Sequence, residues 1–304
     1  MLQEIFYWIF NMSIIAALTG VLVLPVRRIR RLPKRLTVFL WIIPYVRMTL
    51  PIGLNSPYSL MTLLTRLTTK TVVVFQPTDG IAFSFANSIM TADSYFPITY
   101  KVSAVAKVFG VASVVWIIGA SSILLTMIVT YVVTMAELKD SVLLRDNIYH
   151  SEKVTSPAVY GILKPKIILP LSYRDKNTEF VLLHERMHIR RLDNLWRLLA
   201  LVVTAFHWFN PLCWIFLKCF LADVELSCDE RVLAKSGADR AKEYAASLLE
   251  SRQGTVVFAS AFGGAKIRTR IENILSFRKL TRFSLAVFAV LIAAVCYVLL
   301  TNAG

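Results

Sequence analysis

The sequence predicts an α-helical polytopic membrane protein with one cytosolic α+β domain. The 304 residues are 56% hydrophobic and only 17% charged, which is too apolar for an ordinary soluble protein. Several apolar runs are long enough to cross a bilayer as helices. Only residues 135–282 have the composition of a soluble domain, with 23 Lys and Arg against 16 Asp and Glu. We therefore expect three transmembrane helices in residues 1–134, the cytosolic domain in 135–282, and a fourth transmembrane helix with a short extracellular end in 283–304.

The net charge of +15 does not indicate a protein that binds nucleic acid directly. The basic residues flank the apolar runs, as they do on the cytoplasmic side of membrane proteins. The expected partner is therefore the lipid bilayer. None of the cysteines lies in a CxxC pair, and we expect reduced packing residues without disulfide bonds at Cys213, Cys219, Cys228 and Cys296.

The first apolar run, residues 5–26, is predicted to span the membrane with the N-terminus outside. No basic residue precedes it, and a basic segment from Arg27 to Arg35 follows it. A cleavable signal peptide has the opposite polarity. The excess of Lys and Arg places the following loop in the cytoplasm.

The chain is predicted to return outward through residues 36–53, with kinks at Pro44 and Pro51. Arg47 lies deep in this run, where a charge is costly. It either snorkels to the outer interface or pairs with a partner inside the helix bundle. A longer extracellular loop follows, and the third span leads back to the cytoplasm.

Two extended runs open the cytosolic domain, at residues 147–154 and 156–170. Pro157, Pro165 and Pro170 restrict them to edge strands and turns. An edge strand beside a metal site would align an extended peptide by main-chain hydrogen bonds. A plain hairpin beneath the next helix is an equally valid interpretation.

The motif HERMH at residues 184–188 lies in the helical pattern of residues 178–193. His184 and His188 are one turn apart on one helix face, where two imidazoles are able to hold one Zn²⁺. Glu185 lies one step round the helix and reaches a metal-activated water as a general base. An ordinary amphipathic helix is the alternative, but a chance match is rare in a chain with four histidines.

A second pair of residues, Glu225 and Asp229, is spaced by one helical turn further along the chain. A catalytic zinc site needs a third protein ligand and an open position for water, and Glu225 is the candidate ligand. Asp229 is placed to accept a hydrogen bond from the far nitrogen of a ligating histidine and to fix its tautomer. Asp193 is a weaker candidate for the same role. The alternative for the acidic pair is a solvated helix face.

The apolar run at residues 195–221 is long enough for a further span, but the metal site argues against a single crossing. Zinc ligands lie about 2 Å from one ion, so His188 and Glu225 must lie on the same side of the membrane. The dipeptide Asn210-Pro211 breaks a helix near the middle of the run. We therefore expect two helices that form a membrane-associated hairpin.

The order of these motifs resembles the BlaR/MecR-type antirepressor metallopeptidases of bacteria. The resemblance rests on four spans, a cytosolic HERMH before ELSCDE, and the runs SPAVYGILKPKIILP, HWFNP and KIRTRIENIL, and it covers nearly the whole chain. It implies a gluzincin-type zinc endopeptidase in the bacterial cytoplasmic membrane. Its implied ligands are His184, His188 and Glu225, and its implied base is Glu185.

The same resemblance implies a role in signal transduction. Receptors of this family respond to β-lactams at an extracellular C-terminal penicillin-binding domain, and they cut themselves and a cytosolic DNA-binding repressor. This chain ends after the fourth predicted span, so the antibiotic signal does not follow from the resemblance. Self-cleavage is expected in the Gly-flanked linker at residues 253–266, near residues 257–262.

The predicted function is thus cleavage of a cytosolic transcriptional repressor by a membrane zinc endopeptidase. One alternative is a housekeeping quality-control protease for membrane proteins, and another is a non-enzymatic membrane transducer with structural zinc. Glu185 favours an enzyme, because a structural zinc site needs no base beside its ligands. A homodimer is a further open alternative.

Overall fold

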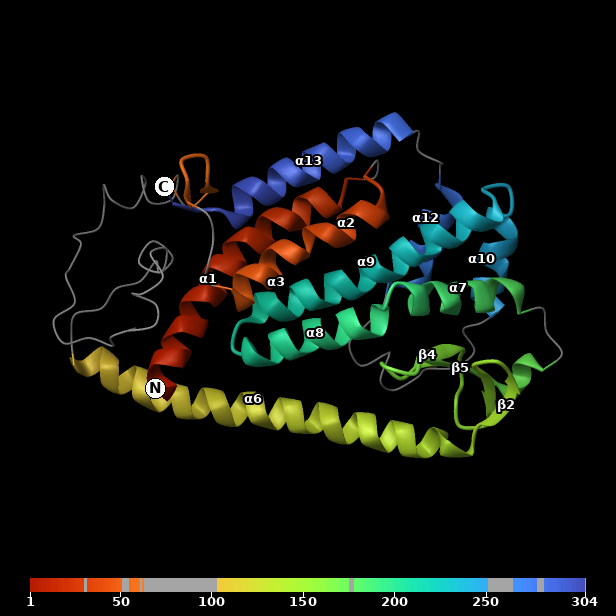
Figure 1. Ribbon diagram of the computed structural model, residues 1–304, viewed down its shortest axis with the longest axis horizontal. Coiled ribbons are helices and arrows are strands. Elements are labelled where there is room, and N and C mark those ends of the chain that lie inside the picture. Colours follow the sequence, from red (N-terminus) through yellow and green to blue (C-terminus); the bar gives the residue numbers. More distant parts are fainter. Residues whose placement is uncertain are drawn as a thin grey trace.

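The structure, a computed structural model, is predominantly helical (Figure 1). It describes residues 1–29, 32–50, 55–60, 62, 103–174, 178–250, 265–277 and 282–303. Most of the predicted extracellular loop and residues 253–264 of the predicted linker, including the expected cleavage region, lie outside the described residues.

Two long helices stand out, α1 (Leu2–Arg27) and α6 (Ser103–Glu137). The segments Leu2–Arg27 and Lys107–Asp140 are long and apolar enough to cross a membrane, each with a mean hydropathy of 2.2 over its most apolar 18 residues. Helix α13 (Arg282–Leu300) contains a shorter described apolar segment, Ala286–Leu300. Length and composition thus identify two candidate spans in the described chain, and the four-span topology stays a prediction.

The predicted second span consists of two short helices, α2 (Lys34–Leu40) and α3 (Ile42–Thr49), which meet at Trp41. Pro44 explains the break, because it has no N–H to donate to the carbonyl of Leu40. Helical hydrogen bonding resumes at the next residue, where Tyr45 N donates to Trp41 O at 3.4 Å. The interruption therefore falls one turn before the proline.

Arg47 on α3 is 1% exposed and pairs inside the helix bundle. Its Nε donates to Leu299 O at 3.0 Å, and its Nη2 donates to Thr301 O. Beside it, strand β1 (Asn55–Ser56) pairs in parallel with β6 (Asn302–Ala303). The carbonyl groups at the end of α13 thus provide the polar partners that a buried guanidinium needs, which favours internal pairing over snorkelling.

The apolar run 195–221 is broken into α8 (Asp193–Phe206) and α9 (Pro211–Ser236), which lie side by side (Figure 1). Asn210 caps α9, because its side-chain oxygen accepts a hydrogen bond from Leu212 N at 3.0 Å. Pro211 occupies the first helical position, where no N–H is required. Because α9 returns alongside α8, both ends of the pair lie next to α7 (Glu179–Arg190).

A small sheet lies at the end of α6, with the strand order β2-β3-β5-β4. Its strands are β2 (Val142–Arg145), β3 (Ile148–Ser151), β4 (Ala158–Tyr160) and β5 (Lys166–Pro170). Strands β3 and β5 are parallel, and the other two pairs are antiparallel. Gly161 (φ +88°) is required in the β4–β5 turn, where a Cβ would lie 2.9 Å from Lys164 O.

Helix α7 packs between this sheet and a helical cluster formed by α9, α10 (Ala241–Glu250) and α12 (Ile267–Leu275). Val181 of α7 joins Ile167 and Leu169 on the sheet side, while Phe180 joins Tyr244 on the helical side. Between these two packed sides, the face of α7 that carries His184 and His188 is directed toward α9. Packing on both flanks therefore holds that polar face in position.

Two acidic residues tie α9 to the connection between α1 and α2. Asp223 accepts two hydrogen bonds from Arg27, both at 2.9 Å, and one from Trp41 Nε1 at 2.8 Å. Glu230 accepts the backbone N–H groups of Lys34 and Arg35 at 2.9 and 3.2 Å, and so caps α2. The carboxylate of Glu230 thus accepts hydrogen bonds at the start of α2 that the N-cap residue Pro33 cannot accept with its own side chain.

Candidate metal centre

Helix α7 brings the two histidines of the motif together, as the spacing predicts. The Nε2 atoms of His184 and His188 lie 3.0 Å apart, and the exposed fractions of the two residues are 7% and 6%. Leu192, which precedes α8, lies in the left-handed region (φ 56°). This turn places Asp193, the first residue of α8, against His188.

Helix α9 crosses α7 and brings in Glu225. Its Oε2 lies 3.6 Å from His184 Nε2, and its Oε1 lies 3.6 Å from His188 Nε2. The three ligands predicted from the sequence therefore meet around one position. Burial alone would raise the pKa of Glu225, but His188, Arg197, His184 and Arg270 hold it well below its usual range.

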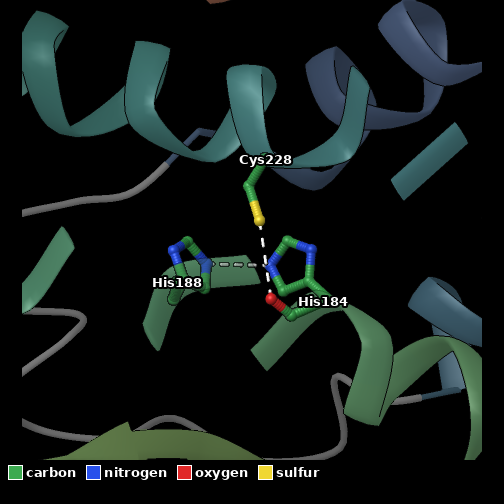
Figure 2. Close-up of side chains that lie close together, drawn as sticks. All are labelled: His184, His188 and Cys228. Atoms are coloured by element: carbon green, nitrogen blue, oxygen red, sulfur yellow. Dashed lines mark hydrogen bonds between the residues drawn. The ribbon is translucent and has the colours of Figure 1, made fainter. Parts of the chain in front are cut away.

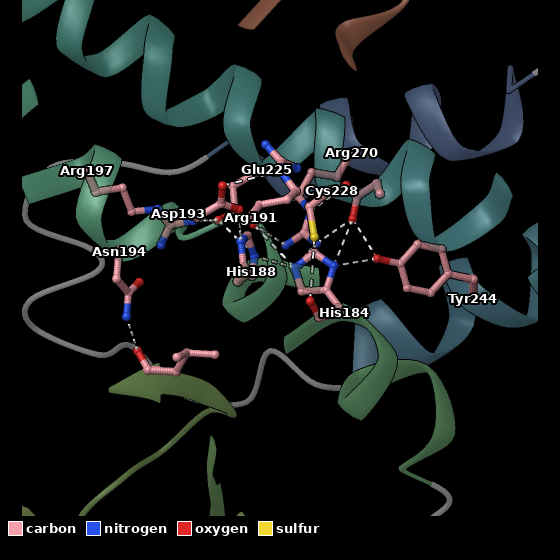
Figure 3. A network of polar contacts seen from close by, with 12 residues as sticks. His184, His188, Arg191, Asp193, Asn194, Arg197, Glu225, Cys228, Tyr244 and Arg270 are labelled. Carbon is pink, nitrogen blue, oxygen red and sulfur yellow. Dashed lines mark hydrogen bonds and ion pairs between the residues drawn. The ribbon is translucent and has the colours of Figure 1, made fainter. Parts of the chain in front are cut away.

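The outer nitrogens of the imidazoles have acidic partners. Asp193 Oδ2 lies 2.6 Å from His188 Nδ1. Asp229 lies 3.4 Å from His184 Nδ1, and the hydroxyl of Tyr244 bridges the two (Figure 3). Tyr244 donates to Asp229 at 2.6 Å and accepts from His184 Nδ1 at 2.8 Å. Tyr244 is a residue that the sequence analysis missed, because no spacing rule relates it to the motif.

This pattern of hydrogen bonds fits a metal ion. Both Nδ1 atoms face acceptors and carry the ring protons, so both Nε2 atoms present lone pairs to each other. Two lone pairs at 3.0 Å repel unless a shared proton or a metal ion lies between them. Burial alone would lower the pKa of His188, but Cys228, Glu225 and the bond to Asp193 raise it to about 9. The site therefore favours positive charge at this position.

Two arginines surround Glu225, and neither was predicted. Arg197 Nη2 of α8 forms an ion pair with Glu225 Oε1, and Arg270 Nη1 of α12 lies 3.4 Å from Oε2. Arg270 also donates two hydrogen bonds to Asp229, at 2.7 and 2.8 Å, and its Nη2 lies 3.3 Å from His184 Nε2. A metal bound to His184 would compete with this last contact and leave Arg270 on Asp229. Arg270 belongs to the run KIRTRIENIL, but nothing in the spacing of that run indicates the role.

Cys228 also lies in the centre, contrary to its interpretation as a packing residue. Its Sγ and the ring nitrogens of His184 and His188 could hold a metal ion, because the three donor atoms lie within 4.8 Å of one another (Figure 2). Burial alone would raise the pKa of Cys228, but the two imidazoles lower it to about 7. The sequence showed an isolated cysteine, and only the crossing of α7 and α9 reveals its neighbours.

Glu185 is 8% exposed and lies next to the paired histidines on α7. Burial raises its pKa, while the two imidazoles oppose this shift. A carboxylate with a raised pKa is a stronger base than an ordinary surface glutamate. Burial raises the pKa of the Tyr160 hydroxyl on β4 to about 12, and the nearby carboxylate of Glu185 adds to this shift.

The outward carbonyl groups of edge strand β4 already have a partner. Asn194 Nδ2 donates to Val159 O and to Gly161 O, each at 3.1 Å. A peptide that paired with this edge would have to displace the Asn194 amide. The structure therefore favours a plain hairpin, which β4 and β5 form, over a strand that is open for peptide binding. The expectation of edge strands is wrong for β3 and β5, because each of them pairs with a strand on both sides.

The donor set defines a candidate metal-dependent hydrolase centre. Two buried imidazoles and a carboxylate converge on one position, Asp193 and the Tyr244–Asp229 pair contact the outer imidazole nitrogens, and the buried carboxyl group of Glu185 is the predicted base. Zinc is the metal that this mixture of nitrogen, oxygen and sulfur donors suits best.

Comparison with known proteins identifies the family. Residues 7–274 match the family described as BlaR1 peptidase M56, so the chain belongs to this family of metallopeptidases. The predicted resemblance to BlaR/MecR-type proteins is thereby confirmed.

Individual relatives are similar over shorter stretches. The regulatory protein BlaR1 of Bacillus licheniformis is 30% identical over 138 residues, which is 42% of this chain and 23% of the relative. The methicillin resistance mecR1 protein of Staphylococcus aureus is 31% identical over 107 residues, which is 34% of this chain and 18% of the relative. The aligned region thus covers less than a quarter of the length of these curated relatives.

Proposed function

We propose that the chain is a membrane zinc endopeptidase of a signal-transduction pathway that cleaves a cytosolic transcriptional repressor and also itself. The observation that carries the proposal is the convergence of His184, His188 and Glu225 beside Glu185. The names of the relatives, which describe regulatory and resistance proteins, support the regulatory role. Family membership supports the peptidase class.

Each residue of the centre has a role in peptide hydrolysis. When zinc is bound, it acts as a Lewis acid that makes a water nucleophilic at neutral pH. Glu185 accepts the proton of the attacking water and delivers it to the leaving amine. Asp193 and the Tyr244–Asp229 pair hold the imidazoles in the tautomer that exposes Nε2. Arg197 and Arg270 keep Glu225 ionised.

The bilayer is the proposed setting of this chemistry. Helix α6 exposes many large apolar side chains along its length, including Val111 at 69% and Ile118 at 61%. Soluble monomers rarely expose apolar surface of this extent. The proposed topology places the N-terminus outside, the α8–α9 hairpin in or on the membrane, and the centre on the cytoplasmic side. A homodimer remains compatible with this arrangement.

The proposal is tested with purified chain and the product of its genomic neighbour as the candidate repressor. We expect cleavage that a chelator stops and that zinc restores. Glu185→Gln should retain zinc and lose cleavage by at least about a hundredfold, because the variant keeps the size of the side chain but not the base. Normal cleavage by Glu185→Gln would disprove the mechanism. Broad digestion of unrelated misfolded membrane proteins, with the repressor spared, would instead indicate quality control.

A further inference from the structure

Cys228 is buried for a different reason from the other fully buried cysteine of α9. Cys213 and Cys228 are both 0% exposed. Cys213 lies in an apolar cluster with Phe216 and Leu217. Cys228 belongs to none of the apolar clusters that the described residues form, and its Sγ faces the two imidazoles. Apolar packing therefore accounts for Cys213 and not for Cys228.

Cys228 adds a sulfur donor beside two imidazoles and a carboxylate whose mutual spacing is close to that of ligands on one zinc ion. Neighbouring donors on a tetrahedral zinc ion are about 3.3–3.6 Å apart, given bonds of about 2.0–2.3 Å. The observed separations are 3.0 Å between the imidazoles and 3.6 Å from each imidazole to Glu225, and Sγ lies within 4.8 Å of both imidazoles. Glu225 and Cys228 are three residues apart and share one face of α9. Helices α7 and α9 thus contribute two donors each.

We propose that Cys228 is a fourth protein ligand of the metal and that the conformation seen here is a latent form of the peptidase. This inference rests on the metal site of the proposed function and adds to it a means of control. The protein partner of the Cys228 thiol in this structure is the carbonyl oxygen of His184, to which it donates at 3.5 Å. Metal binding would replace this weak hydrogen bond with a thiolate bond and release the thiol proton to solvent.

A fourth ligand has a direct chemical consequence. Catalytic zinc sites keep one position open for water, whereas sites with four protein ligands are closed. With Cys228 bound, Glu185 has no water from which to accept a proton. Activation then requires only that the Cys228 side chain turn away from the metal while Glu225, one turn earlier on α9, stays in place, and it needs no redox reaction.

Cobalt spectroscopy tests the ligation without depending on activity. The chain is loaded with Co²⁺ in a variant that retains Cys228 alone, made by Cys213→Ala, Cys219→Ala and Cys296→Ala. We expect a thiolate-to-cobalt charge-transfer band in the near ultraviolet, and a zinc–sulfur distance of about 2.3 Å by X-ray absorption of the zinc form. In the wild-type background, Cys228→Ala should abolish the band, and Cys213→Ala, the matched buried control on the same helix, should retain it.

The outcomes separate this inference from the proposed function. Metal that binds without a sulfur signal overturns the ligation by Cys228 and leaves the three-ligand peptidase site in place. Failure of the wild-type chain to bind Co²⁺ or Zn²⁺ overturns the proposed metal site itself. Because the triple variant retains Cys228, the ligation is tested even if Cys228→Ala does not fold.

Azide, a small anion that binds open cobalt positions, tests the latency. We expect azide to leave the spectrum of the wild-type cobalt protein unchanged and to change that of Cys228→Ala, whose fourth position is open. Cys213→Ala should behave as the wild type does. An azide response of the same size in wild type and Cys228→Ala would show that the site is already open and would overturn the latent form.

Discussion

Among the proposed ligands, Glu225 is the one that lies near both histidines of α7 and also near two arginines, Arg197 of α8 and Arg270 of α12. We expect Glu225→Ala to lose most of its zinc, since the variant removes an anionic ligand and leaves the guanidinium of Arg197 without this carboxylate beside the position that the metal would take. Zinc content per chain, measured on purified protein, checks this. Glu250→Ala, at the exposed end of α10, is the control. Wild-type zinc content in Glu225→Ala would remove Glu225 from the site.

Tyr244 offers a test of the imidazole tautomer. Tyr244→Phe keeps the buried ring but removes the hydroxyl that links His184 to Asp229. We expect zinc affinity to fall about tenfold to a hundredfold, as is typical when a partner behind a ligating histidine is lost. Competition with a chelator measures the affinity. Tyr149→Phe, in the sheet, controls for loss of a hydroxyl, and an unchanged affinity in Tyr244→Phe would mean that Asp229 alone orients His184.

At the scale of residues, the sequence predicted the members of the centre that motif spacing or the need for a ligand indicates, and it missed those that only tertiary packing brings there. His184, Glu185 and His188 follow from helical periodicity, and Glu225 follows from the demand for a third ligand. The roles of Arg197, Tyr244 and Arg270 depend on how α8, α10 and α12 pack against α7 and α9, which local spacing does not encode. Cys228 was misread for the same reason.

Among the elements, α7 begins at Glu179, which forms an ion pair with Arg240, the residue just before α10. Arg240 binds Glu179 through two hydrogen bonds, at 2.7 and 3.0 Å, and its guanidinium lies 4.5 Å from the ring of Phe180. These bonds lower the pKa of Glu179. The Glu179–Arg240 ion pair therefore stabilises the fold fully above the unfolded-state pKa of a glutamate, about 4.3. This stabilisation is lost as the pH falls through the lower pKa that Glu179 has in the folded state.

We therefore expect Glu179→Gln to melt slightly below the wild type at neutral pH and at the same temperature as the wild type in strong acid. The difference should be small and should shrink further in high salt, because the pair is exposed and screened. Thermal melts across pH in detergent measure this. A difference that persists at the lowest pH would show that packing of the Glu179 side chain, and not its charge, stabilises α7.

The positions where helices are interrupted show which features follow from neighbouring residues in the sequence. The turn at Asn210-Pro211 was predicted because proline and an N-cap residue act within a few residues of their own position. The interruption between α2 and α3 was expected at Pro44 itself and falls at Trp41, because the missing hydrogen bond affects the preceding turn. Strand β2 was not predicted, since its four residues are all exposed and depend on pairing with β3.

For the whole molecule, the α8–α9 hairpin links the topology to the centre. We expect cysteines introduced at Arg174 and Lys235, both exposed, to be labelled only from the cytoplasmic side. The background is the variant that retains Cys228 alone, whose buried thiol should remain unlabelled and so serves as the control. Labelling of the two positions from opposite sides would contradict the hairpin in the membrane and separate Glu225 from His188.

The attachment of α9 to the α1–α2 connection has a thermodynamic consequence. Asp223 and Glu230 lie on either side of Glu225 and Cys228 along one continuous helix. If a shift of that connection changes the affinity of the centre for metal, then metal must change the equilibrium of the connection by the same factor, because the coupling free energy is shared. Zinc loading should therefore alter hydrogen exchange at the backbone amides of Lys34 and Arg35, which Glu230 holds. The metal would in this sense be an effector of the membrane region as well as a cofactor of the cytosolic one.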